Sequence, residues 1–134
     1  MALFAIASSL LQQDYHGYTD TAQARKDALH KEGKTFLRRL AKTLGLPVGS
    51  YNIRCNRGGI AVSGEVTLHG DRLYVQLAEM AIGSDGLELL YRPCRGKKDY
   101  TGGPNQFVSL RTLAKSPEKW ESFLEDCRHL SREG

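Results

Sequence analysis

A change of hydrophobic period near residue 45 constrains the fold of this chain more than any other feature of its sequence. Before it, apolar residues recur every three or four positions, which places them on one stripe of an α-helix. After it, from residue 51, they alternate with polar residues, which places them on one face of a β-strand. The sequence therefore predicts an α+β domain in which a long helix precedes an antiparallel sheet.

The long helix is expected over residues 20–44. A side-chain oxygen of Thr19 or Asp20 can cap its start. Gly45, followed by Pro47, should end it, because glycine tolerates the left-handed conformation at a helix terminus and proline cannot continue the helix. The apolar stripe consists of Ala22, Leu29, Phe36, Leu37, Leu40 and Leu44.

Four strands are expected in the alternating region. Gly70 and Asp71 fit a two-residue hairpin turn of type II′, which favours glycine first. In that register Leu68 lies opposite Leu73 and Val66 lies opposite Val75, so the apolar side chains share one face. The expected strands cover residues 51–56, 60–69, 72–77 and 87–92.

The C-terminal part predicts a second helix. Ser116 fits the N-cap position, Pro117 the first helical position and Glu118 the first turn. Residues 106–109 fit a short extended piece. The whole chain, 1–134, is thus expected to be one α+β domain with a long N-terminal helix, a four-stranded antiparallel β-meander and a C-terminal helix.

Composition narrows the class of protein. A chain of 134 residues with 40% hydrophobic and 25% charged residues can build one core and is not of the disordered or collagen type. No run approaches the roughly 20 apolar residues of a membrane span. The three cysteines form no CxxC pair, which favours reduced thiols in a cytoplasmic protein and no metal site. The net charge of +4 is compatible with polyanion binding and equally with plain solubility.

The N-terminus is apolar between Ala2 and Leu11 and has no basic stretch before it, unlike a secretory signal. Its apolar residues recur every three or four positions. Residues 1–13 are therefore expected to form a short helix that docks on the domain, on a protein partner or on another copy.

Two basic segments are candidates for binding. On the long helix, Lys34, Arg38 and Lys42 extend from Lys31 as a stripe opposite the apolar one, and this stripe can follow phosphates or simply be solvated. Asp27 lies on the same side. A second candidate is the glycine-rich loop after the fourth strand, where cations next to an aromatic residue suit single-stranded nucleic acid. Its residues are Arg92, Arg95, Lys97, Lys98 and Tyr100.

A third candidate surface is the polar face of the sheet, which can be an open binding platform or an ordinary solvated face. It is expected to carry Asn52, Arg54, Asn56, Ser63, Glu65, Thr67, Tyr74, Gln76, Glu88, Leu90 and Arg92.

Signatures of catalysis are weak. The four histidines fall on different expected elements, and no GxSxG or HExxH motif is present. Asp99 and Tyr100 could do acid–base work only if a histidine came close in the fold. The sequence predicts no catalytic residue, no metal and no cofactor.

The stretches RGGIAVSGEVTLHGDRLYVQL and YRPCRGKKDYTGGPNQFVSL resemble small accessory proteins of bacterial phages and plasmids. The resemblance covers residues 51–110. It implies a compact cytosolic binder that engages nucleic acid or a nucleoprotein machine, and some proteins of this kind block host defence systems such as CRISPR effectors. No residue role is carried over from it.

The favoured hypothesis is a non-enzymatic cytoplasmic protein whose basic surface engages nucleic acid or a nucleoprotein complex. The alternative is a protein–protein adaptor or inhibitor that uses the segment from Ala2 to Leu11 or the sheet face and touches no nucleic acid. The sequence leaves the oligomeric state open and predicts no contact with a membrane.

Overall fold

The computed structural model describes residues 22–56, 65–79, 87–96 and 104–133. The expected N-terminal helix, residues 1–13, lies outside them. In chain order the elements are α2 (Ala22–Thr43), β1 (Tyr51–Asn56), β2 (Glu65–Gly70), β3 (Leu73–Glu79), β4 (Leu87–Pro93), β5 (Gln106–Ser109), α3 (Leu110–Lys115) and α4 (Pro117–Glu133).

The sheet confirms the antiparallel meander and corrects its size. It has five strands in the order β1-β2-β3-β4-β5, each antiparallel to the next, where the sequence predicts four. The added strand is β5, which coincides with the short extended piece expected at residues 106–109 and places Phe107 opposite Leu90. A strand of four residues shows little alternation, and it forms here because β4 supplies its hydrogen-bond partners.

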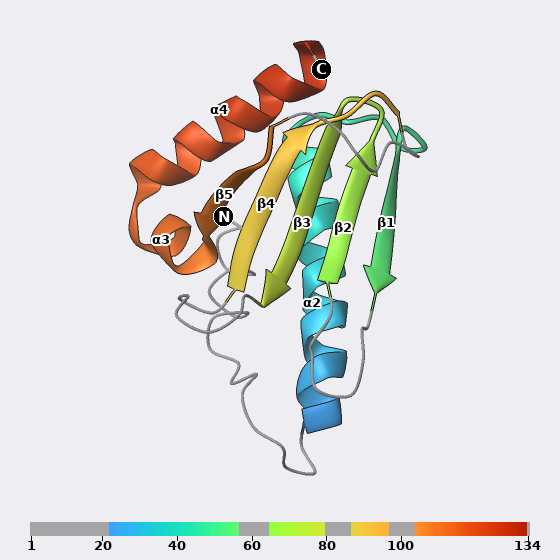
Figure 1. The fold of residues 1–134 in the computed structure, drawn as a ribbon, viewed down its shortest axis with the longest axis vertical. Coiled ribbons are helices and arrows are strands. Elements are labelled where there is room, and N and C mark those ends of the chain that lie inside the picture. Colours follow the sequence, from blue (N-terminus) through green and yellow to red (C-terminus); the bar gives the residue numbers. More distant parts are fainter. Residues whose placement is uncertain (1–21, 57–64, 80–86, 97–103, 134) are drawn as a thin grey trace.

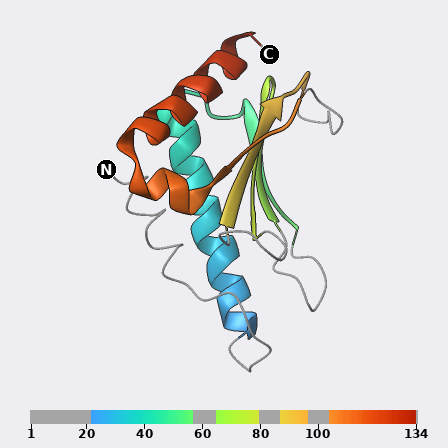
Figure 2. The same cartoon turned by 60° about the vertical axis from the view of Figure 1, so that its left-hand side comes forward.

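The sheet is covered by helices on one face, called here the inner face (Figure 2). α2 packs over β1 and β2, whereas α4 packs over β3 and β4. The inner face carries the alternating apolar residues, and Val66, Leu68, Val75, Leu77 and Leu89 are fully buried there. The opposite face, the outer face, carries the polar residues of the same strands.

The predicted apolar stripe of α2 is the stripe that meets the sheet. Leu29, Phe36, Leu37 and Leu40 are fully buried. The helix ends as expected, because Gly45 adopts a φ of 76°. The amide of Gly45 donates to the carbonyl of Lys42, and the amide of Leu46 donates to that of Ala41, which is the Schellman arrangement.

The predicted hairpin between β2 and β3 is wrong in register by two residues. Leu68 lies opposite Val75, and Val66 lies opposite Leu77. Gly70 does not turn with a positive φ but continues β2 opposite Tyr51 of β1. A shift of two residues keeps every side chain on its predicted face, so the division into inner and outer faces survives the error.

The C-terminal helix begins as predicted. The Ser116 hydroxyl accepts a hydrogen bond from the amide of Lys119, at 3.3 Å, and so caps α4. Trp120 and Phe123 of α4 are buried, and the Trp120 ring meets the Phe36 ring of α2 edge-on at 6.3 Å. This contact joins the two helices above the sheet.

The close approach of α2 to the sheet gives a first prediction. A Cβ at Gly33 would lie 3.0 Å from Cγ2 of Val66 and 3.3 Å from Cδ2 of Leu77. Gly33→Ala should therefore lower the free energy of unfolding by about 1 kcal/mol, because crowding outweighs the gain in helix propensity. Urea denaturation measures this change.

Thr35→Ala on the exposed side of α2 is the matched control, since it gains helix propensity without crowding the sheet. Equal stabilisation by both substitutions would show that α2 does not approach the sheet this closely.

A second prediction concerns alkaline pH. Burial, assisted by the charge of Asp126 and by Cys127, raises the pKa of Tyr91 from 10.0 to about 12, and the Tyr91 hydroxyl donates to Oδ2 of Asp126 at 3.4 Å. The unfolded tyrosine ionises near its ordinary pKa of about 10, while the folded one stays protonated. The contribution of Tyr91 to stability is therefore complete below about pH 10 and is lost as the pH rises towards about 12.

Tyr91→Phe should remove this part of the pH dependence. Urea denaturation of both proteins between about pH 9 and about pH 11, on either side of the ordinary pKa of tyrosine, should give a free-energy difference that shrinks as the pH rises. A difference independent of pH would contradict the assignment.

Candidate functional site

The first candidate surface is a row of cations along α2, called here the basic ridge. It consists of Lys31, Lys34, Arg38, Arg39 and Lys42. The apolar stripe faces the sheet, so the opposite side of the helix faces away from it. Lys34 is half-buried and the other four side chains are exposed.

The charges of the ridge are available to an external anion. Within the described part of the chain, none of the five cations forms an ion pair. Asp27, also exposed, lies one turn before Lys31 and reduces the local potential at that end. The most positive part of the ridge is therefore its C-terminal half, from Lys34 to Lys42.

A shallow hollow marks this C-terminal half. Its volume is about 290 Å³, and it is lined by Thr35, Arg38, Arg39 and Lys42. Three cations around one depression can hold a phosphate or carboxylate group from several sides. Arg39 is absent from the predicted stripe, because at about 100° per residue it lies at the margin of that stripe.

The second candidate surface is a polar cluster on the outer face of the sheet, called here the outer-face cluster. The strand register places Asn52, His69, Tyr74 and Arg92 side by side across β1 to β4. Arg54 and Gln76 belong to the next row. The face predicted from alternation is thus confirmed for the residues the structure describes.

His69 is the centre of this cluster and is fully buried. Its Nδ1 atom lies 3.2 Å from Nη1 of Arg54. A guanidinium group has only donors, so Nδ1 accepts and the ring proton is on Nε2. The His69 ring meets the Tyr74 ring edge-on at a centroid distance of 5.0 Å.

Arg92 occupies the other side of Tyr74. Its guanidinium carbon lies 4.2 Å from the centre of the Tyr74 ring, and its Nη1 donates to the carbonyl of Pro93 at 3.2 Å. The Tyr74 hydroxyl donates to Oε1 of Gln76 at 3.1 Å. With only 5% of its surface exposed, Arg92 serves as a packed cation over an aromatic ring more than as a surface phosphate contact.

The structure separates the predicted binding residues. Lys34, Arg38 and Lys42 belong to α2, and Arg92 belongs to the outer face of the sheet. α2 covers the opposite, inner face (Figures 1 and 2). Arg95 is exposed just after β4. The remaining predicted residues, Lys97, Lys98 and Tyr100, lie outside the described residues.

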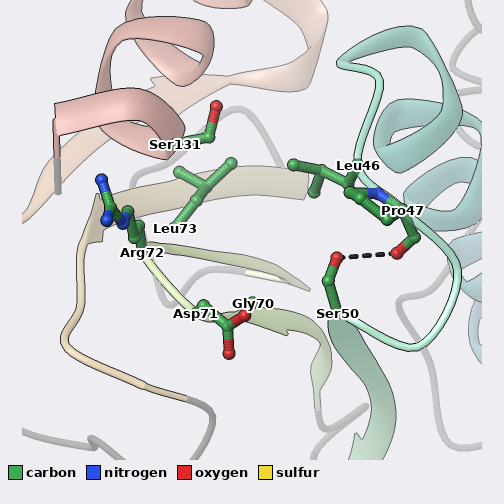
Figure 3. Close-up of a pocket in the computed structure, with 8 residues that line it drawn as sticks. All are labelled: Leu46, Pro47, Ser50, Gly70, Asp71, Arg72, Leu73 and Ser131. Atoms are coloured by element: carbon green, nitrogen blue, oxygen red, sulfur yellow. Dashed lines mark hydrogen bonds between the residues drawn. The ribbon is translucent and has the colours of Figure 1, made fainter.

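A small pocket lies at the end of the sheet, between the loop after α2, the β2–β3 turn and the end of α4 (Figure 3). Its volume is about 220 Å³, and Leu46 and Leu73 form its apolar part. The Ser50 hydroxyl at its rim donates to the carbonyl of Pro47 at 2.7 Å. The pocket is smaller than the roughly 300 Å³ at which small-molecule sites begin.

Two of the three cysteines are poorly placed for reactive chemistry. All three are free thiols, and Cys94 and Cys127 are buried. Burial raises the pKa of Cys127 far above its ordinary value, so its thiolate is scarce at neutral pH. The described residues contain no group of three metal-ligating side chains. None of the described helices is long and apolar enough to span a membrane.

The outer-face cluster gives a third prediction. Tyr74→Leu removes the ring that contacts both His69 and Arg92, whereas Tyr74→Phe keeps the ring and loses the hydroxyl that donates to Gln76. Tyr74→Leu should lower the free energy of unfolding by about 1–2 kcal/mol more than Tyr74→Phe does. Urea denaturation measures both, and equal losses would show that the ring contacts contribute nothing.

Comparison with protein-family models, with curated proteins and with solved structures finds no match for this chain. Its function is therefore inferred from the geometry and charge of the surfaces described above.

Proposed function

We propose that this chain is a non-enzymatic cytoplasmic binding protein whose basic ridge engages the phosphate backbone of nucleic acid, either free or held within a nucleoprotein complex. One observation carries the proposal. Lys31, Lys34, Arg38, Arg39 and Lys42 line the outward side of one helix, and none of them forms an ion pair with another described residue.

The spacing of the ridge suits a phosphate backbone. From Lys31 to Lys42 the helix rises about 16 Å, and successive turns bring a cation to the surface about every 5.4 Å. Such contacts position a strand without reading its sequence, and each one releases a condensed counterion. Binding through the ridge is therefore expected to be salt-dependent and tolerant of sequence.

The resemblance to accessory proteins of phages and plasmids favours a more specific role. A compact protein with a cationic helix can occupy a site that a defence complex uses for its own nucleic acid, or can bind that nucleic acid directly. This resemblance therefore supports inhibition of a host defence system as the biological role of the chain.

A protein partner is the alternative, and one observation favours it. Phe107 of β5 is 55% exposed, and it lies opposite the half-buried Leu90 on the outer face of the sheet. An exposed aromatic residue beside an aliphatic one is typical of a protein contact. The second expected contact, the segment from Ala2 to Leu11, lies outside the described residues.

Neutralising the ridge tests the proposal. Fluorescence anisotropy with labelled single- and double-stranded oligonucleotides, between about 50 and 200 mM salt, should show binding that weakens steeply with salt. The Lys34→Gln, Arg38→Gln, Lys42→Gln triple variant should bind more weakly. Its slope of log K against log salt should fall by about 2 to 3, close to one unit per lost phosphate contact.

A matched control separates the effect of the ridge from the effect of the overall net charge. The Arg111→Gln, Lys115→Gln, Lys119→Gln variant loses the same formal charge from exposed positions of α3 and α4. Equal loss of affinity in both triple variants would exclude the ridge as the binding surface. No binding by the unaltered protein at low salt would favour the protein partner, and Phe107→Ser would then be examined in pull-down experiments.

A further inference from the structure

β1 is an edge strand of the described sheet. Its register with β2 is continuous from Tyr51 opposite Gly70 to Asn56 opposite Glu65. No described strand pairs with its other side, which lies at the edge away from α4 (Figure 1). An edge strand presents a row of backbone donors and acceptors that another strand can pair with.

β1 has few of the features that usually protect such an edge. Its sequence, YNIRCN, contains no proline and no lysine, and its pairing with β2 has no bulge. Arg54 is its only charged residue. These features favour the addition of another strand to this edge.

The apolar layer is also incomplete at this edge. Ile53 and Cys55 of β1 are only partly buried, whereas the residues opposite them on β2, Leu68 and Val66, are fully buried. Tyr51 is partly buried in the same row. A strand added beside β1 would extend the apolar layer over these three side chains.

The pattern of β1 is complementary to itself. Two copies of one edge strand can pair antiparallel around a twofold axis perpendicular to the sheet, with side chains of the same face opposite each other. Centring the axis on Arg54 would set two like charges directly opposite, which is unfavourable. Centring it on Ile53 sets Ile53 against itself, Tyr51 against Cys55, and Asn52 against Arg54.

We propose that the chain forms a twofold dimer in which β1 pairs with β1 of a second copy, in the register centred on Ile53. The two sheets then form one continuous sheet with a shared apolar face. Because α2 packs over β1 and β2, both basic ridges lie on the same side of the dimer. The pairing itself does not depend on nucleic-acid binding.

Two substitutions that introduce opposite charges at one exposed residue test the register. Asn52 is exposed on the outer face of the sheet. In the proposed dimer it lies opposite Arg54 of the second copy, and the twofold axis repeats this contact. Asn52→Glu should tighten the dimer and Asn52→Lys should weaken it, with dissociation constants that differ by roughly tenfold. Sedimentation velocity of the full chain over a range of concentrations measures this, and circular dichroism checks that each variant is folded.

Disulfide trapping provides a second measurement. In a Cys55→Ser background, Ile53→Cys places two thiols directly opposite each other, at a Cα separation of about 4.5–5.5 Å that a disulfide can span. With oxidised glutathione it should form a covalent dimer. The control, Asn52→Cys, is offset by two positions and should not.

Three results would overturn the proposal. The first is a monomer at every concentration, which would show that β1 does not pair with a second copy of this chain. The second is a dimer that responds equally to Asn52→Glu and Asn52→Lys. The third is a dimer in which Ile53→Cys and Asn52→Cys cross-link equally, which would place the interface elsewhere.

Discussion

The burial of the apolar inner face of the sheet is the interaction on which the rest of this structure depends. Two helices share the task, since α2 covers β1 and β2 while α4 covers β3 and β4. The edge-on contact between Phe36 and Trp120 joins the two helices over the sheet. Because α2 must turn its apolar stripe towards the strands, its rotation about its own axis is fixed, and its cations have to face outward.

Local periodicity explains how much of the fold could be predicted from the sequence. The apolar stripe of α2 and the alternation of the strands each depend on neighbours within one element, so the end of α2, the N-cap of α4 and the faces of the strands follow from the sequence. The expected start of the long helix, with Thr19 or Asp20 as its cap, lies outside the described residues, and the short helix α3 is not predicted. The sequence indicates an extended piece at the residues of β5 but not its place in the sheet, because the pairing with β4 depends on a partner outside the segment. The hairpin register failed for a related reason. Gly70 fits a tight turn, but in the fold it pairs with Tyr51 of β1, a partner that lies far away in sequence.

The same distinction applies to the candidate surfaces. The basic ridge belongs to one helix, so the helical period alone is enough to group Lys34, Arg38 and Lys42. The outer-face cluster comes from cross-strand pairing, which brings His69 between Arg54 and Tyr74. Arg92 is a residue whose surroundings in the fold differ from those suggested by its neighbours in sequence. Its neighbours in sequence suggest a cationic loop, yet the sheet places it over an aromatic ring, where most of its surface is buried.

The division of charge between the two sides of the sheet has a mechanistic consequence. A cation that is packed on a ring and hydrogen-bonded to a carbonyl has already lost most of its hydration, so Arg92 contributes to the stability of the outer face and little to long-range attraction. Four of the five cations of the ridge are exposed and keep their hydration, so they remain able to replace counterions condensed on a polyanion. Under the proposed function, attraction of a polyanion depends on α2. The outer face, with its packed rings and the exposed Phe107, has the ordered and partly apolar character of a surface suited to a specific protein contact.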